Sequence, residues 1–232
     1  MGDLLVHPEI EYGPYVASDA EAMTRLLAEV FSRHDPLAFA VGVTAEDFEN
    51  FVRPLCAKVS AEGLTYVARR SDTGRLVGVL LTEDTASPAP EELSTLDKKF
   101  DPVMGILGEI VAEYRAGKEP MLGESLHLFL LGVSDEVTRR GVGQELVRVV
   151  VENGARRGYR VAIAEVTNKV SQHIFRKLGF VSRAHRSYLD YRFRGEAVFA
   201  GIAEYGGPIL MEKSLAPDTG SKSNAQRATK SL

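Results

Sequence analysis

The stretch from Leu126 to Gly143 constrains the fold of this chain more than any other part of the sequence. Residues 126–133 form an apolar run that is interrupted only by His127 and Gly132, and this length and composition predict a buried strand. A short polar turn follows, and a helical pattern of apolar residues begins at Val142. We therefore predict a strand, a glycine-containing turn and a helix, in that order.

The turn at Thr138–Gly143 has the composition of an anion-binding site. The first N–H groups of a helix have no partner within the helix, and the helix dipole adds partial positive charge there. Glycines let the backbone approach an oxygen atom closely, and Arg139 and Arg140 add charge. The expected ligand is a phosphate or pyrophosphate, although an ordinary strand–helix turn remains the alternative. The turn lacks the Gly-Lys-Ser/Thr of a P-loop, and Leu146 stands where a dinucleotide-binding fingerprint has its third glycine.

The remaining pattern predicts an α/β (α+β) fold with a mixed sheet and helices on both faces. Helical periodicity covers Asp19–Phe31, Thr44–Glu62, Leu96–Arg115, Gly141–Arg156 and Asn168–Leu178. Strands are expected at residues 64–70, 76–83, 126–133, 159–166 and 208–215, with two more between Phe180 and Phe199, around Arg194–Glu196. Strands 126–133 and 160–167 should be parallel, with a right-handed crossover. We expect one domain over residues 1–215 and a disordered polar tail at 216–232.

Composition excludes several classes of protein. The apolar content of 44% and the charged content of 26% are ordinary for a soluble globular chain, and the net charge of −4 argues against nucleic acid as the main partner. The single cysteine, Cys56, excludes intrachain disulfides and a zinc cluster, and its place in an apolar helical face predicts a buried side chain. No apolar run reaches ~18 residues, and no signal peptide is visible. We therefore expect a cytoplasmic protein without a metal or a membrane partner, and we leave a homodimer open.

The stretch from Leu126 to Gly143 also resembles a known motif. Leu131-Gly132-Val133 followed by Thr138-x-Arg140-Gly141-x-Gly143 is similar to motif A of the GCN5-related N-acetyltransferases, in which Arg/Gln-x-x-Gly-x-Gly/Ala follows a strand end of the Leu-x-Val type. Thr138 departs from the Arg/Gln position. The resemblance implies the acetyltransferase fold, with a central twisted, mostly antiparallel sheet whose parallel strand pair is splayed at the cofactor site. It implies that acetyl-CoA is bound by Leu131, Gly132, Val133, Thr138, Arg139, Arg140, Gly141, Val142 and Gly143.

A second block supports the same resemblance. Asn168-x-x-Ser171-x-x-x-Phe175, followed by Leu178-Gly179-Phe180, is similar to the family's Asn-x-x-Ala/Ser-x-x-x-Tyr-x-x-Leu-Gly-Phe. In the family the Asn and the aromatic residue lie along the CoA arm, which implies this role for Asn168 and Phe175. The family's Tyr is often the general acid for the thiolate, and a phenyl ring cannot donate a proton.

Scattered positions resemble the arylalkylamine N-acetyltransferases of the insect type. Phe31-x-x-x-Asp35-Pro36-Leu37 and the run at Tyr188–Tyr191 carry this similarity, which implies Asp35 as the general base and, by position, a catalytic role for Ser171. The subgroup has Glu where this chain has Asp35, so the contact with the amine could run through water. His127 is the second candidate for the base. The alternatives are a turn residue for Asp35 and a hydrogen-bonded core histidine for His127.

The sequence thus predicts an acetyl-CoA-dependent N-acetyltransferase that transfers an acetyl group directly to a small primary amine, with an arylalkylamine as the first expectation. A non-catalytic acyl-CoA-binding or sensor protein is one alternative, because Phe175 and Thr138 depart from the family pattern. A peptide N-terminal acetyltransferase is another.

Overall fold

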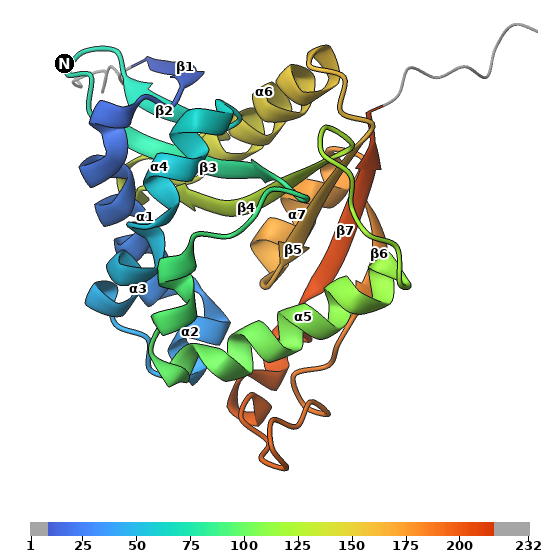
Figure 1. Ribbon diagram of the computed structural model, residues 1–232. Coiled ribbons are helices and arrows are strands. Elements are labelled where there is room, and N and C mark those ends of the chain that lie inside the picture. The colour runs from blue at the N-terminus through green and yellow to red at the C-terminus, as the bar shows by residue number, and fades with distance from the viewer. Residues whose placement is uncertain (1–8, 216–232) are drawn as a thin grey trace, which may run out of the picture.

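A seven-stranded sheet in the order β1-β2-β3-β4-β5-β7-β6 forms the centre of the molecule (Figure 1). The computed structural model describes residues 9–215, so the predicted tail at 216–232 lies outside the described residues. The strands are β1 (Ile10–Pro14), β2 (Tyr66–Arg70), β3 (Leu76–Asp84), β4 (Ser125–Val133), β5 (Val161–Val166), β6 (Val181–His185) and β7 (Ile209–Ser214). β7, the last strand within residues 9–215, is inserted between β5 and β6, and it pairs with both in antiparallel orientation.

The predicted parallel pair is present and it splays. β4 and β5 pair only through Ser125, Leu126 and His127 of β4, and the two strands separate beyond this point. On its other side β4 continues to pair with β3 as far as Val133. We call the point beyond His127, where β4 and β5 diverge, the fork. The β3–β4 register shifts next to it: Leu81 pairs with Leu130 but Thr82 pairs with Leu128, so β4 has a β-bulge there.

Helices cover both faces of the sheet, as predicted. The helices are α1 (Ala20–His34), α2 (Pro36–Ala40), α3 (Ala45–Val52), α4 (Leu55–Glu62), α5 (Asp101–Arg115), α6 (Val142–Arg156) and α7 (Lys169–Lys177). Apolar residues of α1, α3 and α4 form one core cluster against the sheet, and apolar residues of α6 and α7 form another. α5 packs over β5, β6 and β7 through a smaller cluster that includes Ile110, Ile163 and Leu210.

Most predicted elements agree with the structure within a few residues, and the differences have local causes. The predicted helix 44–62 is broken into α3 and α4 at Pro54, and Thr44 caps it as expected, because its Oγ1 accepts a hydrogen bond of 3.2 Å from the N–H of Asp47. The side chain of Asp19 does not cap α1; it accepts from the N–H of Val16 and pairs with Arg69.

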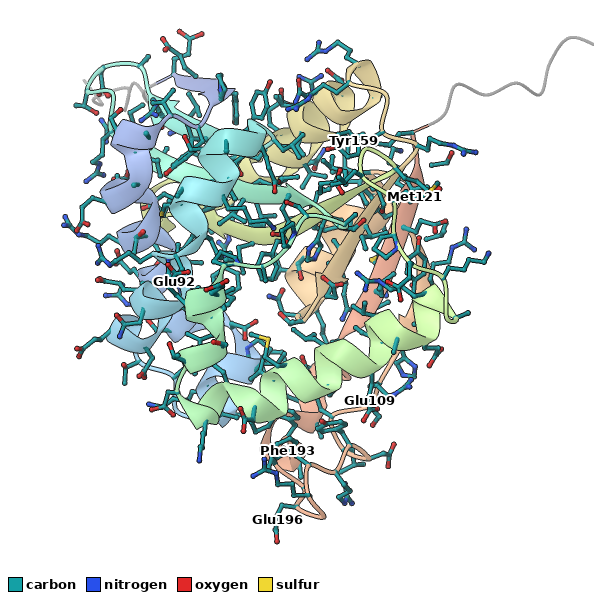
Figure 2. All side chains as sticks on the ribbon, in the orientation of Figure 1. Glu92, Glu109, Met121, Tyr159, Phe193 and Glu196 are labelled. Atoms are coloured by element: carbon teal, nitrogen blue, oxygen red, sulfur yellow. The ribbon has the colours of Figure 1, made fainter. Side chains whose placement is uncertain are left out.

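Of the two strands expected between Phe180 and Phe199, β6 is present and the one expected at Arg194 is wrong. The segment around Arg194 contains only an isolated bridge between Phe193 and Glu196, and a 3₁₀ helix (Ala200–Tyr205) follows it. Figure 2 shows Phe193 and Glu196 in the loop beyond α5, and it shows Glu109 on α5 itself. Glu109 pairs with Arg186, which lies at the start of this loop. The segment therefore packs against α5 as irregular structure and does not extend the sheet.

The chain just before β7 packs closely against the backbone of Arg186, and Gly207 makes this contact possible. Its φ is +154°, and an added Cβ would lie 1.8 Å from the carbonyl oxygen of Arg186, while its own carbonyl oxygen accepts a hydrogen bond of 3.1 Å from Nε2 of Gln172 on α7. We expect Gly207→Ala to lower the free energy of unfolding by at least roughly 2 kcal/mol, because backbone must move to admit the methyl group. Urea unfolding would measure this change in the free energy of unfolding.

Gly201→Ala is the matched control for this substitution. An added Cβ at Gly201 meets no atom within 4 Å. The control should therefore change stability by less than about 0.5 kcal/mol. If the two variants have the same free energy of unfolding, the backbone at Gly207 admits a methyl group at no cost and the prediction is wrong.

Candidate active site

A cavity opens at the fork between β4 and β5 on the face covered by α1, α3 and α5. α1, α2, α3, β4, β5, α5 and α7 all contribute to its wall. Six aromatic rings line it: Phe31, Phe48, Phe51, Phe100, Phe129 and Phe175. Its ionisable lining residues are His34, Asp35 and Glu165. An apolar cavity with a few convergent polar groups is the usual form of a small-molecule site.

Asp35 lies in this cavity as a buried carboxylate. Asp35 separates α1 from α2, and its Oδ1 accepts a hydrogen bond of 2.9 Å from the N–H of Ala38, which caps α2. Its Oδ2 accepts a second hydrogen bond, of 2.6 Å, from the hydroxyl of Thr167 just beyond β5. The residue is 9% exposed, and burial raises the pKa of Asp35 although the bonds from Thr167 and the backbone oppose the shift. A carboxyl of this kind can take a proton from a bound amine.

His127 does not line the cavity; it lies at the base of the fork. Its Nδ1 is 3.0 Å from Glu83 on β3 and its Nε2 is 2.6 Å from Glu165 on β5, so the ring connects the strands on both sides of β4. Burial alone would lower the pKa of His127, but the charges and hydrogen bonds of Glu165 and Glu83 raise it to about 10. Glu83 is also paired with Lys58. With both ring nitrogens occupied and the ring held protonated, His127 is poorly placed to act as a general base.

The predicted anion-binding turn has the geometry that its sequence indicates. Gly141 takes a left-handed conformation with φ of +77° immediately before α6, so the N–H groups of the first turn of α6 point out of the helix end. The side chains of Thr138, Arg139 and Arg140 are exposed beside this end. The N–H of Arg140 donates to the carbonyl of Val137 at 3.3 Å, so this amide is already used within the turn.

The end of β4 meets the start of α6. A Cβ added at Gly143 would lie 3.5–3.8 Å from the side chains of Val133, Leu131 and Ile174, so β4, α6 and α7 converge there. The N–H of Ser134 donates to Val77 on β3. Hydrogen-bonding groups alternate along an antiparallel strand, so Gly132 also faces β3, whereas the N–H groups of Leu131 and Val133 point to the side from which β5 has departed. This edge of β4 can pair with an extended ligand.

The second sequence block lies on α7, at the cavity. The side chain of Asn168 accepts a hydrogen bond of 2.9 Å from the N–H of Ser171 and so caps α7, and the hydroxyl of Ser171 donates to the carbonyl oxygen of Asn168 at 3.0 Å. Phe175 is buried and packs edge-on against Phe180. All three predicted residues, Asn168, Ser171 and Phe175, line the cavity.

The sequence interpretation missed two residues of this site. Glu165 is a charged residue in an otherwise apolar strand, which is a signal that could have singled it out. Thr167 offers no such signal, because a threonine after a strand is ordinary in sequence. Only the fold brings it to Asp35, 132 residues away.

The splayed parallel pair, the bulge in β4 and the glycine turn before α6 together define the fold of the GCN5-related N-acetyltransferases. Residues 115–189 match the family model of FR47-like proteins. The predicted resemblance to this superfamily is confirmed, as is the predicted mixed sheet with one parallel pair.

Several solved structures share this fold. The C-terminal condensation domain of Ebony in complex with beta-alanyl-dopamine has a TM-score of 0.82 at 15% identity, covering 90% of this chain and all of that chain. Arylalkylamine N-acetyltransferase 2 from Aedes aegypti has a TM-score of 0.75 at 19% identity, with the same coverage of both chains. A polyamine N-acetyltransferase of Drosophila melanogaster that forms N-acetylagmatine has a TM-score of 0.70 at 19% identity, covering 89% of this chain and all of that chain.

The buried ion pairs of His127 give the stability of the fold a definite pH dependence. The folded state holds a proton on His127 up to about pH 10, whereas an unfolded histidine loses its proton near pH 6.5. The stabilisation is therefore complete below pH 6.5 and declines as the pH rises toward 10. We expect His127→Gln to lower the free energy of unfolding by roughly 3–5 kcal/mol at pH 6.5, because Glu165 and Glu83 lose their cation, and by less at pH 9.5.

Urea unfolding at the two pH values would measure this difference, with His185→Gln as the control. His185 is exposed on β6, so its replacement should have little effect at either pH. If His127→Gln lowers the free energy of unfolding by the same amount at both pH values, His127 is not held protonated in the folded state.

Proposed function

We propose that this protein is an acetyl-CoA-dependent N-acetyltransferase that acts on a small primary amine, with an arylalkylamine as the first substrate class. The observation that carries the proposal is the carboxylate of Asp35, buried in an aromatic cavity beside the fork of β4 and β5. The similarity to solved acetyltransferases supports the reaction class.

The residues at the fork fit acetyl-CoA. Acetyl-CoA would supply an acetyl group activated as a thioester. The N-terminus of α6, with Arg139 and Arg140 beside it, would hold the pyrophosphate. The open edge of β4 at Leu131 and Val133 would pair with the amides of the pantetheine arm, and an N–H group of this edge would stabilise the thioester oxygen as it gains negative charge.

Asp35 would supply the base that the reaction needs. A primary amine is protonated at neutral pH and must lose a proton before its nitrogen can attack a carbonyl carbon. Asp35 would take this proton, directly or through a water molecule, as the new C–N bond forms and the C–S bond to CoA breaks. Its raised pKa brings the carboxyl closer to the pH at which it works, and activity should therefore fall as the pH falls through this value.

The rings around Asp35 support an aromatic amine. Phe31, Phe48 and Phe51 form a stacked and edge-on series, with ring centroids 4.7 Å and 5.4 Å apart, on the α1–α3 side of the cavity. Such walls favour a flat apolar group, and the carboxylate favours an ammonium group attached to it. A polyamine would place methylene groups and a second charge against the same rings, which this surface suits less well.

Phe175 favours one alternative function. Its ring replaces the family's tyrosine and cannot protonate a departing thiolate, so a non-catalytic protein that binds acyl-CoA is the second candidate. Ser171 lies one helical turn earlier on α7, and among the residues that line the cavity it carries the hydrogen-bond donor nearest to Phe175 in sequence. Direct departure of the thiolate would need no donor at all.

The deciding experiment replaces the charge of Asp35 without changing its shape. We expect Asp35→Asn to lower kcat/KM for tyramine and other arylalkylamines by about 10²–10⁴-fold in an assay of free thiol release, because the amine keeps its proton. Binding of acetyl-CoA, measured by calorimetry, should be nearly unchanged, because the proposed contacts of the cofactor lie on β4 and α6 and do not include Asp35.

Asp72→Asn is the matched control, since Asp72 lies in the exposed turn between β2 and β3 and pairs with Arg70 and Thr73 beside it. Tight binding of acetyl-CoA to the unaltered protein with no thiol release across an amine panel would reject the enzyme in favour of the binding protein. Failure of acetyl-CoA to bind would reject both candidates.

A further inference from the structure

Thr167 is held by hydrogen bonds on both its side chain and its backbone. It follows Val166, the last residue of β5, which pairs with Ile209 at the end of the β5–β7 ladder. Its hydroxyl donates to Oδ2 of Asp35 at 2.6 Å, and its carbonyl oxygen accepts a hydrogen bond of 3.0 Å from the hydroxyl of Tyr188. Three segments that are distant in sequence therefore meet at this one threonine.

Tyr188 is a rigid partner for the threonine. Its side chain is fully buried and packs against Phe199 with a ring-centroid distance of 5.8 Å. Burial and the charge of Asp35 raise the pKa of Tyr188 far above its usual range, so the hydroxyl remains a donor at every working pH. A buried residue of the segment between β6 and β7 therefore holds the backbone of Thr167 in addition to the end of β5.

The two oxygens of Asp35 have different kinds of partner. Oδ1 accepts from the N–H of Ala38, which can only donate. Oδ2 accepts from the hydroxyl of Thr167, which can both donate and accept. When Asp35 gains a proton on Oδ2, the new O–H can donate to the Thr167 oxygen, and the threonine proton can turn away. The contact thus survives in both protonation states.

We propose that Thr167 is the positioning residue of the general base: it orients the carboxylate of Asp35 and accepts the hydrogen bond from the carboxylic acid after proton transfer. The proposal rests on the proposed function of Asp35 as a base. Tyr188 acts one step further away, by fixing the backbone of Thr167. Neither residue needs to touch the substrate for this role.

The other ionisable groups around Asp35 are few. His34 precedes it on α1 and lies 3.2 Å from Asp135, and Glu165 lies two residues before Thr167 on β5 and is paired with His127. Tyr188 faces Thr167 from the β6–β7 segment. The residues of α3 and α5 that line the cavity are apolar. Since His34 and Glu165 each have another partner, Thr167 is the side chain that hydrogen-bonds to the base.

The test compares Thr167→Val with Thr167→Ser. Valine keeps the shape and loses the hydrogen bond, so the carboxylate loses a stabilising donor and the pKa of Asp35 should rise. We expect kcat to fall about tenfold or more, the acidic limb of the kcat/KM profile to move to higher pH, and the KM for acetyl-CoA to stay constant. Serine retains the hydroxyl and should restore most of the loss.

Thr82→Val is the matched control. Thr82 is also buried and hydrogen-bonded, but it lies on β3 away from the cavity lining. Its replacement should leave the pH profile unchanged even if it lowers stability. If Thr167→Val behaves like Thr82→Val, or if Thr167→Ser is as impaired as Thr167→Val with no movement of the acidic limb, the proposal is overturned.

A second pair of variants tests the contribution of Tyr188. Tyr188→Phe should reduce kcat less than Thr167→Val does, with a smaller shift of the acidic limb in the same direction. Tyr159→Phe is its control, because Tyr159 also donates to a buried carboxylate, that of Asp84, at 3.0 Å. Figure 2 places Tyr159 near the start of β5, at the opposite end of the strand from Thr167.

A readout that does not require turnover separates this proposal from the proposed function. Carbon-13 NMR of labelled aspartate carboxyls can follow the titration of Asp35, assigned with Asp35→Asn, in protein without acetyl-CoA. A higher pKa in Thr167→Val supports the hydrogen-bond role even if the panel of amines finds no activity. An unchanged pKa overturns the proposal even if Asp35→Asn shows that Asp35 is the base.

Discussion

The bridge from Glu83 through His127 to Glu165 is the interaction on which the geometry of the site depends. It links β3, β4 and β5 at the residue where β4 and β5 cease to pair. Strands that continued to pair would close the sheet over the cavity, whereas strands without a link could separate earlier. Burying three charged groups stabilises a fold little or not at all compared with apolar groups of similar size. What it does provide is a link between the three strands at the residue where the fork begins.

The fork determines the other properties of the site. Because β5 turns away, the groups of β4 beyond His127 that point to the β5 side have no strand partner there, and the start of α6 lies at the far end of the same edge. Because β5 ends at Val166, Thr167 can approach the segment between α1 and α2 and bond to Asp35. The ligand-binding edge and the buried base are thus two results of one separation of strands. The burial of Asp35 opposes folding, and the fold tolerates it because Ala38 and Thr167 donate to both of its oxygens.

Sequence periodicity predicted the parts of the fold that have long regular elements. The apolar faces of α1, α5 and α6 and the apolar run of β4 are strong signals, and each was predicted within a few residues. α2 was missed because five residues are too few to show a period. Of the two strands expected between Phe180 and Phe199, β6 formed, but the one at Arg194 was wrong because aromatic residues there pack against α5 and do not pair in the sheet. For the site, the glycine turn could be derived from the residues, and Asp35 was singled out by family resemblance. Glu165 and Thr167 could not be placed, since their roles come from contacts between distant segments.

The insertion of β7 between β5 and β6 has a consequence for how this chain acquires its structure during synthesis. A ribosome releases the strands in order, so β5 and β6 must wait without their shared neighbour until residues 209–214 have emerged. Pairings of large sequence separation form slowly, and an unpaired strand edge is prone to wrong association in the meantime. The half of the sheet that carries Thr167 is therefore the last to be completed. Nascent chains that stall before this point would expose that edge to chaperones, whereas the β1–β4 half could already be assembled.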